Sequence, residues 1–242
     1  MKSKYTRSKL YLSCYRILTF LALPGRLRHR NLVFVRDSKN PLAAIFEKYG
    51  SDKGSIKNNV RHNYHLWYEL FFSHRAEMVT GVMEIGIGTN KNDFQSTMGP
   101  KGISGASLRA FKNYFPNASI VGLDIDDEIL FNEERIITYW VDQQNKESLR
   151  KVSSQLIEEG LEMDLIVDDG LHTELAARNT LEETFILLKK DGIYVIEDIP
   201  LRKVSRYLKL TKSFGSQAYL FGGQSQKNHK LYSDNNILFI IK

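Results

Sequence analysis

Five short apolar runs, separated by stretches with a helical pattern, constrain the fold of this chain most strongly. The runs cover residues 81–85, 119–123, 136–139, 164–167 and 193–196. Helical patterns cover residues 107–114, 146–159 and 173–188, and two further helices are expected at 42–49 and 65–72. Short apolar strands alternating with helices are typical of βαβ units with a buried parallel sheet. We therefore expect a doubly wound α/β domain.

The end of the chain follows a different pattern. Residues 217–221 and 236–241 are rich in β-formers, and the linker 222–235 between them is polar and contains glycine. This pattern predicts an antiparallel hairpin at the edge of the sheet. Five parallel strands plus the hairpin give a sheet of seven strands.

The positive charge of the chain is concentrated at its beginning. Residues 1–30 contain eight basic residues and no acidic one, whereas the remainder has 26 basic and 28 acidic residues. The formal net charge of +6 therefore belongs to an N-terminal arm, and the nearly neutral remainder argues against a general nucleic-acid-binding face. We expect an arm over residues 1–40 and one catalytic domain over residues 41–242.

Within the arm, polar residues recur at Lys9, Ser13, Arg16 and Thr19, which is helical spacing in an otherwise apolar run. The run 10–23 is too short to span a membrane and contains Arg16, so we predict an amphipathic helix. Two interpretations stay open: the helix packs on the domain or a second subunit, or it lies on an anionic membrane surface. The single cysteine excludes an intrachain disulfide and suits a reducing compartment, so we expect a cytoplasmic protein, with the inner face of a membrane as the site of any membrane contact.

The first three strands end in residues suited to binding a nucleoside-containing cofactor. The first ends in Glu84, Gly86 and Gly88, an E-x-G-x-G turn that lets the backbone approach a ligand. Asp124 ends the second strand and can accept hydrogen bonds from ribose hydroxyls. Asp142 follows the third strand, on the expected adenine side. The segment 91–105 lengthens the first loop and is expected to cover the cofactor.

The fourth and fifth strands end in acidic residues. Asp169 follows the fourth strand, and Glu197 and Asp198 follow the fifth, so neighbouring strands bring three carboxylates together. Carboxylates this close repel one another unless a cation bridges them, and oxygen ligands favour Mg²⁺, with Mn²⁺ or Ca²⁺ as alternatives. His172 lies three residues beyond Asp169, where an imidazole could take the proton of an acceptor hydroxyl.

These motifs resemble the metal-dependent sugar O-methyltransferases of the macrolide and rhamnosyl-tailoring type, a class I S-adenosylmethionine (SAM) methyltransferase family. The matching pieces are YGSDKG (49–54), EIGIGTN (84–90), GASLRAFKNYFPNA (105–118), GLDID (122–126), VDQ (141–143), IVDDGLH (166–172) and YVIED (194–198). The resemblance implies a Mg²⁺ site at Asp169, Glu197 and Asp198, with His172 as general base. It also implies SAM along 84–88, with Asp124 at the ribose and Asp142 near the adenine.

The expected function is methyl transfer from SAM to a hydroxyl of a sugar or glycan, as in polysaccharide biosynthesis, with Mg²⁺ assistance. Two alternatives stay open: a metal-dependent hydroxylase on a related scaffold, and a non-catalytic SAM-binding protein at a membrane. A short-chain dehydrogenase is disfavoured because the Tyr-x-x-x-Lys pairs at 5/9 and 49/53 precede the first strand. The expected partners are the acceptor and a membrane contacted through residues 1–30, with no nucleic acid, and a homo-oligomer is compatible with the sequence.

Overall fold

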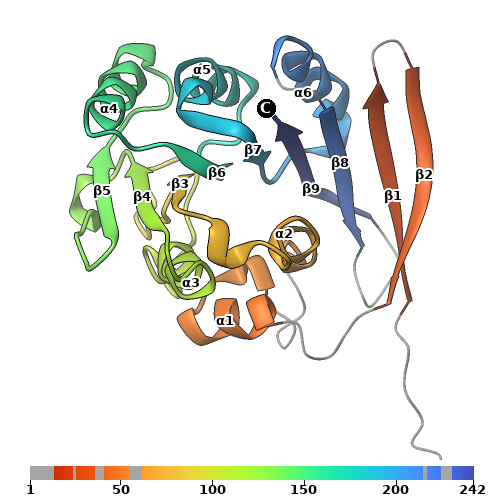
Figure 1. The fold of residues 1–242 in the computed structure, drawn as a ribbon, viewed down its shortest axis with the longest axis horizontal. Helices are drawn as coiled ribbons and strands as arrows, with labels where there is room; N and C mark the ends of the chain where they lie inside the picture. The colour runs from red at the N-terminus through yellow and green to blue at the C-terminus, as the bar shows by residue number, and fades with distance from the viewer. Residues whose placement is uncertain (1–13, 24–25, 36–40, 55–61, 215–216, 225–230) are drawn as a thin grey trace, which may run out of the picture.

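The computed structural model describes residues 14–23, 26–35, 41–54, 62–214, 217–224 and 231–242. The described strands form one sheet in the order β2-β1-β8-β9-β7-β6-β3-β4-β5 (Figure 1). These are β1 (Cys14–Leu23), β2 (Arg26–Val35), β3 (Gly81–Ile85), β4 (Ser119–Asp124), β5 (Ile136–Trp140), β6 (Met163–Asp168), β7 (Leu188–Ile196), β8 (Gln217–Gln224) and β9 (Leu231–Ile241). The α-helices are α1 (Pro41–Tyr49), α2 (His65–Phe72), α3 (Ala106–Tyr114), α4 (Lys146–Glu158), α5 (Glu174–Thr184) and α6 (Val204–Leu210). Short 3₁₀ turns lie at Asp52–Gly54, Ala76–Met78, Asp127–Ile129, Phe185–Leu187, Leu201–Lys203 and Thr211–Ser213.

The seven predicted strands are confirmed, and β1 and β2 extend their sheet to nine described strands. Strands β7, β6, β3, β4 and β5 pair in parallel. The two C-terminal strands pair antiparallel with each other, and β9 pairs antiparallel with β7. From β3 the chain continues to β4 and β5 on one side, whereas β6 and β7 lie on the other side of β3, so the strand order reverses between β3 and β6. In sheets of this type, ligands bind at such a switch point, beyond the carboxyl ends of the strands.

Helices cover both faces of the parallel strands, with α1, α2 and α3 on one side and α4, α5 and α6 on the other (Figure 1). Successive residues of one strand point to opposite faces, so Val82 packs into the first apolar cluster and its neighbour Met83 into the second. The first cluster is rich in aromatic rings from α2 and α3, including Trp67 and Phe111. Burial on both faces explains why these strands appear in the sequence as continuous apolar runs.

The prediction of a helical arm is wrong for the described residues 14–23. These residues form β1, which pairs antiparallel with β2 from Cys14↔Val35 to Leu23↔Arg26. Tyr15, Ile17, Thr19 and Phe20 are residue types that favour strands, and the open edge of β8 offers backbone partners that outweigh helical spacing. The part of the predicted helix before residue 14 lies outside the described residues.

The strand β1 pairs with β8 through Phe20–Ala22, so the arm extends the sheet of the main domain. The boundary at residues 40/41 remains a prediction. Among the described helices, none combines the length and apolar character needed to cross a bilayer.

The end of β3 and the loop after β6 are in direct backbone contact. The amide of Asp169 donates to the carbonyl of Ile85 at 2.9 Å. Gly86 has a φ of +84°, and a Cβ built on it would lie 2.3 Å from the carbonyl oxygen of Asp169. Any larger residue would therefore push apart the two loops that carry the functional residues.

We expect Gly86→Ala to destabilise the fold by roughly 2–4 kcal/mol, because it adds a backbone clash to a left-handed conformation. Gly160→Ala is the matched control, since Gly160 has a φ of +72° and no described atom lies within 4 Å of the position of its Cβ. That control should cost about 1–2 kcal/mol. Urea unfolding of both variants measures the difference, and equal losses would contradict the clash.

Candidate active site

A cleft of about 620 Å³ opens at the carboxyl ends of the parallel strands. Four of the predicted cofactor residues line it: Gly86, Gly88, Asp124 and Asp142. The predicted Asp169, His172 and Asp198 line the same cleft. The structure therefore brings together, in one cavity, residues that are more than 100 positions apart in the chain.

The donor half of the cleft is built from backbone turns and carboxylates. Gly86 and Gly88 have φ values of +84° and +92°, which glycine adopts without strain. Asp124 accepts a hydrogen bond from the backbone of Ile87 at 2.8 Å, and burial raises the pKa of its carboxyl group. Asp142 accepts from the backbone of Gln144 at 2.8 Å. The carboxylates are thus fixed by the main chain and face a cavity that could hold a nucleoside.

The long loop after β3 forms one wall of this cleft. Its residues 93–98 belong to the lining, which supports the expectation that the segment covers a bound cofactor. The loop is held at both ends: the amide of Met98 donates to the carbonyl of Thr89 at 2.9 Å, and Ser104 Oγ donates to the carbonyl of Gly88 at 2.7 Å.

Asp169, His172 and Asp198 form a cluster whose ligand atoms all lie within 4.8 Å of one another. His172 Nε2 lies 3.8 Å from Asp198 Oδ2. The three side chains are each about one quarter exposed, so they face the cleft instead of the core. The carboxylate oxygens of Asp169 and Asp198 suit a hard divalent cation such as Mg²⁺ or Mn²⁺, and the imidazole of His172 lies beside them.

Backbone strain coincides with this cluster. His172 and Asp198 have φ values of +54° and +52°, and they are two of the four described non-glycine residues with a positive φ. Such conformations cost about 1–3 kcal/mol each and persist where surrounding contacts hold them. One such contact is the Tyr64 hydroxyl, which donates to Asp198 Oδ1 at 2.5 Å.

Glu197, the third predicted metal ligand, lies beneath the cleft surface formed by Asp169, His172 and Asp198. Its side chain is fully buried, its Oε1 accepts a hydrogen bond from Tyr68 at 2.5 Å, and its Oε2 contacts Lys53. It lines no part of the cleft. Its role as a ligand therefore stays a prediction.

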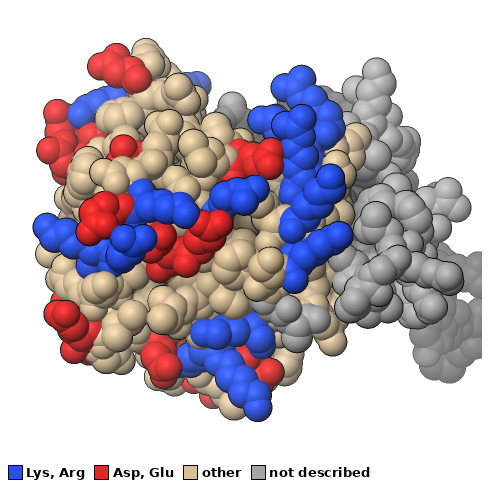
Figure 2. All heavy atoms as spheres, turned by 90° about the horizontal axis from the view of Figure 1, so that it is seen from above, with Lys and Arg blue, Asp and Glu red and all other residues tan. Residues whose placement is uncertain are grey.

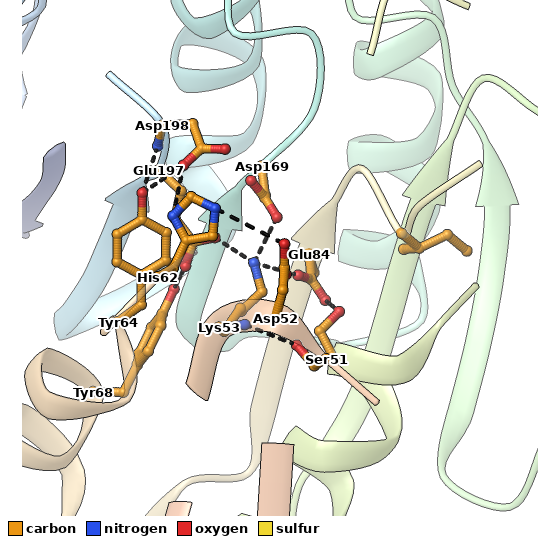
Figure 3. A network of polar contacts seen from close by, with 12 residues as sticks. Ser51, Asp52, Lys53, His62, Tyr64, Tyr68, Glu84, Asp169, Glu197 and Asp198 are labelled. Carbon is orange, nitrogen blue, oxygen red and sulfur yellow. Dashed lines mark hydrogen bonds and ion pairs between the residues drawn. The ribbon is translucent and has the colours of Figure 1, made fainter. Parts of the chain in front are cut away.

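Lys53 lies between Asp169 at the cleft and the buried carboxylates of Glu84 and Glu197 (Figure 3). Its Nζ lies 2.6 Å from Asp169 Oδ2 and 3.2 Å from Glu84 Oε1, and it also contacts Glu197. Burial lowers the pKa of this ammonium, but the three carboxylates outweigh burial and hold the pKa well above its usual range. Lys53 is therefore a buried, charged lysine.

Glu84, predicted to contact the cofactor, lies beneath the floor of the cleft. It is fully buried, and its Oε2 accepts a hydrogen bond from Ser107 at 2.5 Å. Burial raises the pKa of Glu84 to about 7, against the opposing effect of Lys53. The structure thus separates Glu84 from the four residues that do line the donor half, and its direct contact with a cofactor stays a prediction.

Gln143 holds the loop that carries His172. Its Nε2 donates to Asp168 Oδ1 at 2.7 Å, and its Oε1 accepts from the backbone of Leu171 at 2.8 Å. No role for Gln143, Lys53, Tyr64 or Tyr68 is predicted from the sequence. Gln143 and Lys53 lie in the motifs VDQ and YGSDKG, and Tyr68 lies in the aromatic helix α2, but none of these patterns identifies a partner.

Comparison with known proteins finds similar enzymes. The 8-demethyl-8-alpha-L-rhamnosyl tetracenomycin-C 2'-O-methyltransferase of Streptomyces olivaceus is 30% identical over 158 residues, 65% of this chain and 37% of that enzyme. The mycinamicin VI 2''-O-methyltransferase of Micromonospora griseorubida is 33% identical over 132 residues, 54% of this chain and 30% of the enzyme. No protein-family model matches.

Among solved structures, the MycE methyltransferase of the mycinamycin pathway, in complex with Mg, SAH and mycinamycin VI, aligns with a TM-score of 0.54 at 29% identity. The alignment covers 66% of this chain and 40% of MycE. The chain thus spans less than half the length of each of these relatives. The comparisons confirm both the seven-stranded methyltransferase fold and the resemblance to metal-dependent sugar O-methyltransferases.

Proposed function

We propose that this protein transfers the methyl group of SAM to a hydroxyl of a sugar or glycan, with the help of Mg²⁺. One observation carries the proposal: the Asp169, His172 and Asp198 cluster opens into the same cleft as Gly86, Gly88, Asp124 and Asp142. A methyl donor bound along the glycine turn would have its sulfonium beside an acceptor held at the cluster. The similarity to sugar O-methyltransferases supports the same reaction.

In the proposed reaction, a C–O bond forms between the methyl carbon and the acceptor oxygen while the S–C bond breaks. SAM leaves as S-adenosylhomocysteine (SAH), and His172 takes the hydroxyl proton on its imidazole. Asp198, 3.8 Å from His172 Nε2, stabilises the imidazolium that forms. Most of the rate gain comes from aligning donor and acceptor, which can supply several kcal/mol.

The residues proposed to hold the metal are Asp169 and Asp198 at the cleft, with Glu197 from the layer beneath. When bound, Mg²⁺ would lower the pKa of the acceptor hydroxyl and fix its oxygen. Lys53 and Tyr68 keep Glu197 oriented. Tyr64 does the same for Asp198.

The acceptor class is also part of the proposal. The relatives act, by their names, on sugars attached to tetracenomycin and mycinamicin. A glycoside of that kind is one candidate acceptor, and a sugar of a surface polysaccharide or a lipid-linked glycan is the other.

We further propose a location at the inner, cytoplasmic face of a membrane. Five basic residues lie on and around α6, and residues 201–214 contain no acidic residue. The five are Arg202, Lys203, Arg206, Lys209 and Lys212. Figure 2 shows a column of Lys and Arg side chains on the side of the molecule where Figure 1 places α6. Together with the eight basic residues of 1–30, they could attract anionic lipid.

The reaction is tested by incubating the protein with labelled SAM and a panel of glycosides, nucleotide sugars and glycans. We expect one acceptor to gain one methyl group and SAH to accumulate. Stripping metal with a chelator should lower the rate about 100-fold or more, because charge stabilisation by a metal is worth several kcal/mol, and Mg²⁺ should restore it. Full activity after chelation would refute the metal requirement, a gain of oxygen would indicate a hydroxylase, and SAM binding without transfer would indicate a non-catalytic protein.

His172→Ala should lower kcat by about 10²–10⁴-fold, the usual contribution of a general base. SAM affinity should stay within about threefold of the parent, because His172 lies on the acceptor side of the cleft. His74→Ala, an exposed histidine on the loop after α2, serves as control. A His172→Ala enzyme that turns over at the control's rate would remove His172 from the mechanism.

Membrane contact is tested by co-sedimentation with vesicles of neutral or 30:70 anionic:neutral phospholipid. We expect binding to anionic vesicles only, weakened about tenfold or more by the triple change Arg202→Gln, Lys209→Gln and Lys212→Gln, since each basic residue is worth about 1 kcal/mol. Lys101→Gln, Lys151→Gln and Lys190→Gln remove the same charge from exposed positions elsewhere. Equal losses in both triple variants would exclude a role for the α6 face.

A further inference from the structure

Lys53 is the only lysine or arginine that the described part of the chain places among the carboxylates at the bottom of the cleft. It is 2% exposed, although it belongs to the lining of the cleft. Its three N–H groups face the carboxylates of Glu84, Asp169 and Glu197. Because three carboxylates engage this ammonium and hold its pKa well above the usual range, Lys53 is not available as a proton acceptor.

Asp169 divides its carboxylate between two neighbours. Its Oδ2 lies 2.6 Å from Lys53 Nζ, and the same side chain supplies an atom to the cluster with His172 and Asp198. Lys53 therefore touches one of the proposed ligands at the cleft and Glu197 in the layer beneath. An ion bound at the cluster would lie close to a fixed positive charge.

The loop that carries Lys53 is held firmly in place. The turn Asp52–Gly54 packs on α1, where a Cβ at Gly54 would lie 2.9 Å from Phe46 Cβ. The amide of Ser51 donates to the carbonyl of Phe46 at 2.9 Å. The ammonium is thus a fixed part of the site and not a side chain that swings in from solvent.

From this geometry we propose that Lys53 is a positioning residue: the resident cation of the metal site. It keeps Glu84, Asp169 and Glu197 assembled in the metal-free protein, and its charge limits how tightly a divalent ion binds, so that the ion stays exchangeable. The inference rests on the proposed metal site. Because like charges repel at short range with little screening in a buried site, removing the ammonium should strengthen metal binding.

The experiment measures Mn²⁺ binding to the metal-free protein at pH 8, by electron paramagnetic resonance of free Mn²⁺, for the parent and for Lys53→Met. We expect the variant to bind Mn²⁺ at least about tenfold more tightly, or to bind a second ion. Lys48→Met removes an exposed lysine of α1 and should match the parent. A purely structural role would weaken metal binding, so unchanged or weaker binding in a variant that still binds SAH would overturn the inference.

A second variant covers the case in which Lys53→Met does not fold. Lys53→Met/Glu84→Gln removes one positive and one negative charge, so the buried layer keeps its net charge. We expect its Mn²⁺ affinity to lie within about threefold of the parent, and a loss of tenfold or more would contradict the charge-based account. Absence of Mn²⁺ binding in the parent and in both variants would refute the proposed metal site together with the inference that rests on it, whereas a parent that binds Mn²⁺ with the same affinity as Lys53→Met would refute only the role of Lys53.

Discussion

The site depends on how buried negative charge is neutralised. Glu84 lies near the carboxyl end of β3, and Asp169, Glu197 and Asp198 directly follow the neighbouring strands β6 and β7. The carboxylates of Glu84, Asp169 and Glu197 contact a single ammonium. Two carboxylates about 4 Å apart repel by roughly 4 kcal/mol at an effective dielectric constant of 20. The arrangement is stable because Lys53 lies among them and because Ser107, Tyr64 and Tyr68 donate hydrogen bonds. A divalent ion and a sulfonium donor would offset the charge that remains.

This constraint links the fold to the site. The parallel strands must pack closely at the switch point for their ends to share a cation, and the contact between Gly86 and the backbone of Asp169 enforces that closeness. Gln143, which follows β5, adds a further link, because its side chain hydrogen-bonds Asp168 at the end of β6 and Leu171 in the loop after β6. Strain at His172 and Asp198 is then tolerated because their neighbours are fixed.

Much of this architecture could be predicted because strand ends are local features. The acids after β6 and β7 and the glycine turn after β3 are adjacent to apolar runs, and the parallel sheet brings them to one edge. Partners from distant segments could not be predicted: nothing near Lys53 in the sequence indicates Glu197, 144 residues away. The helix expected at 173–188 ends at Thr184, because Leu188 already pairs with Met163. Residues 14–23 form a strand instead of the predicted helix, because pairing with the edge of β8 outweighs helical periodicity and the sequence does not reveal that edge.

The most direct test is a crystal structure of the protein grown with Mn²⁺ and SAH, with the metal located by its anomalous scattering. We expect one peak bound by Asp169, Asp198 and Glu197, with the sulfur of SAH in the adjoining cleft near Gly86 and the ribose at Asp124. A peak elsewhere, or SAH bound outside this cleft, would contradict the proposed site.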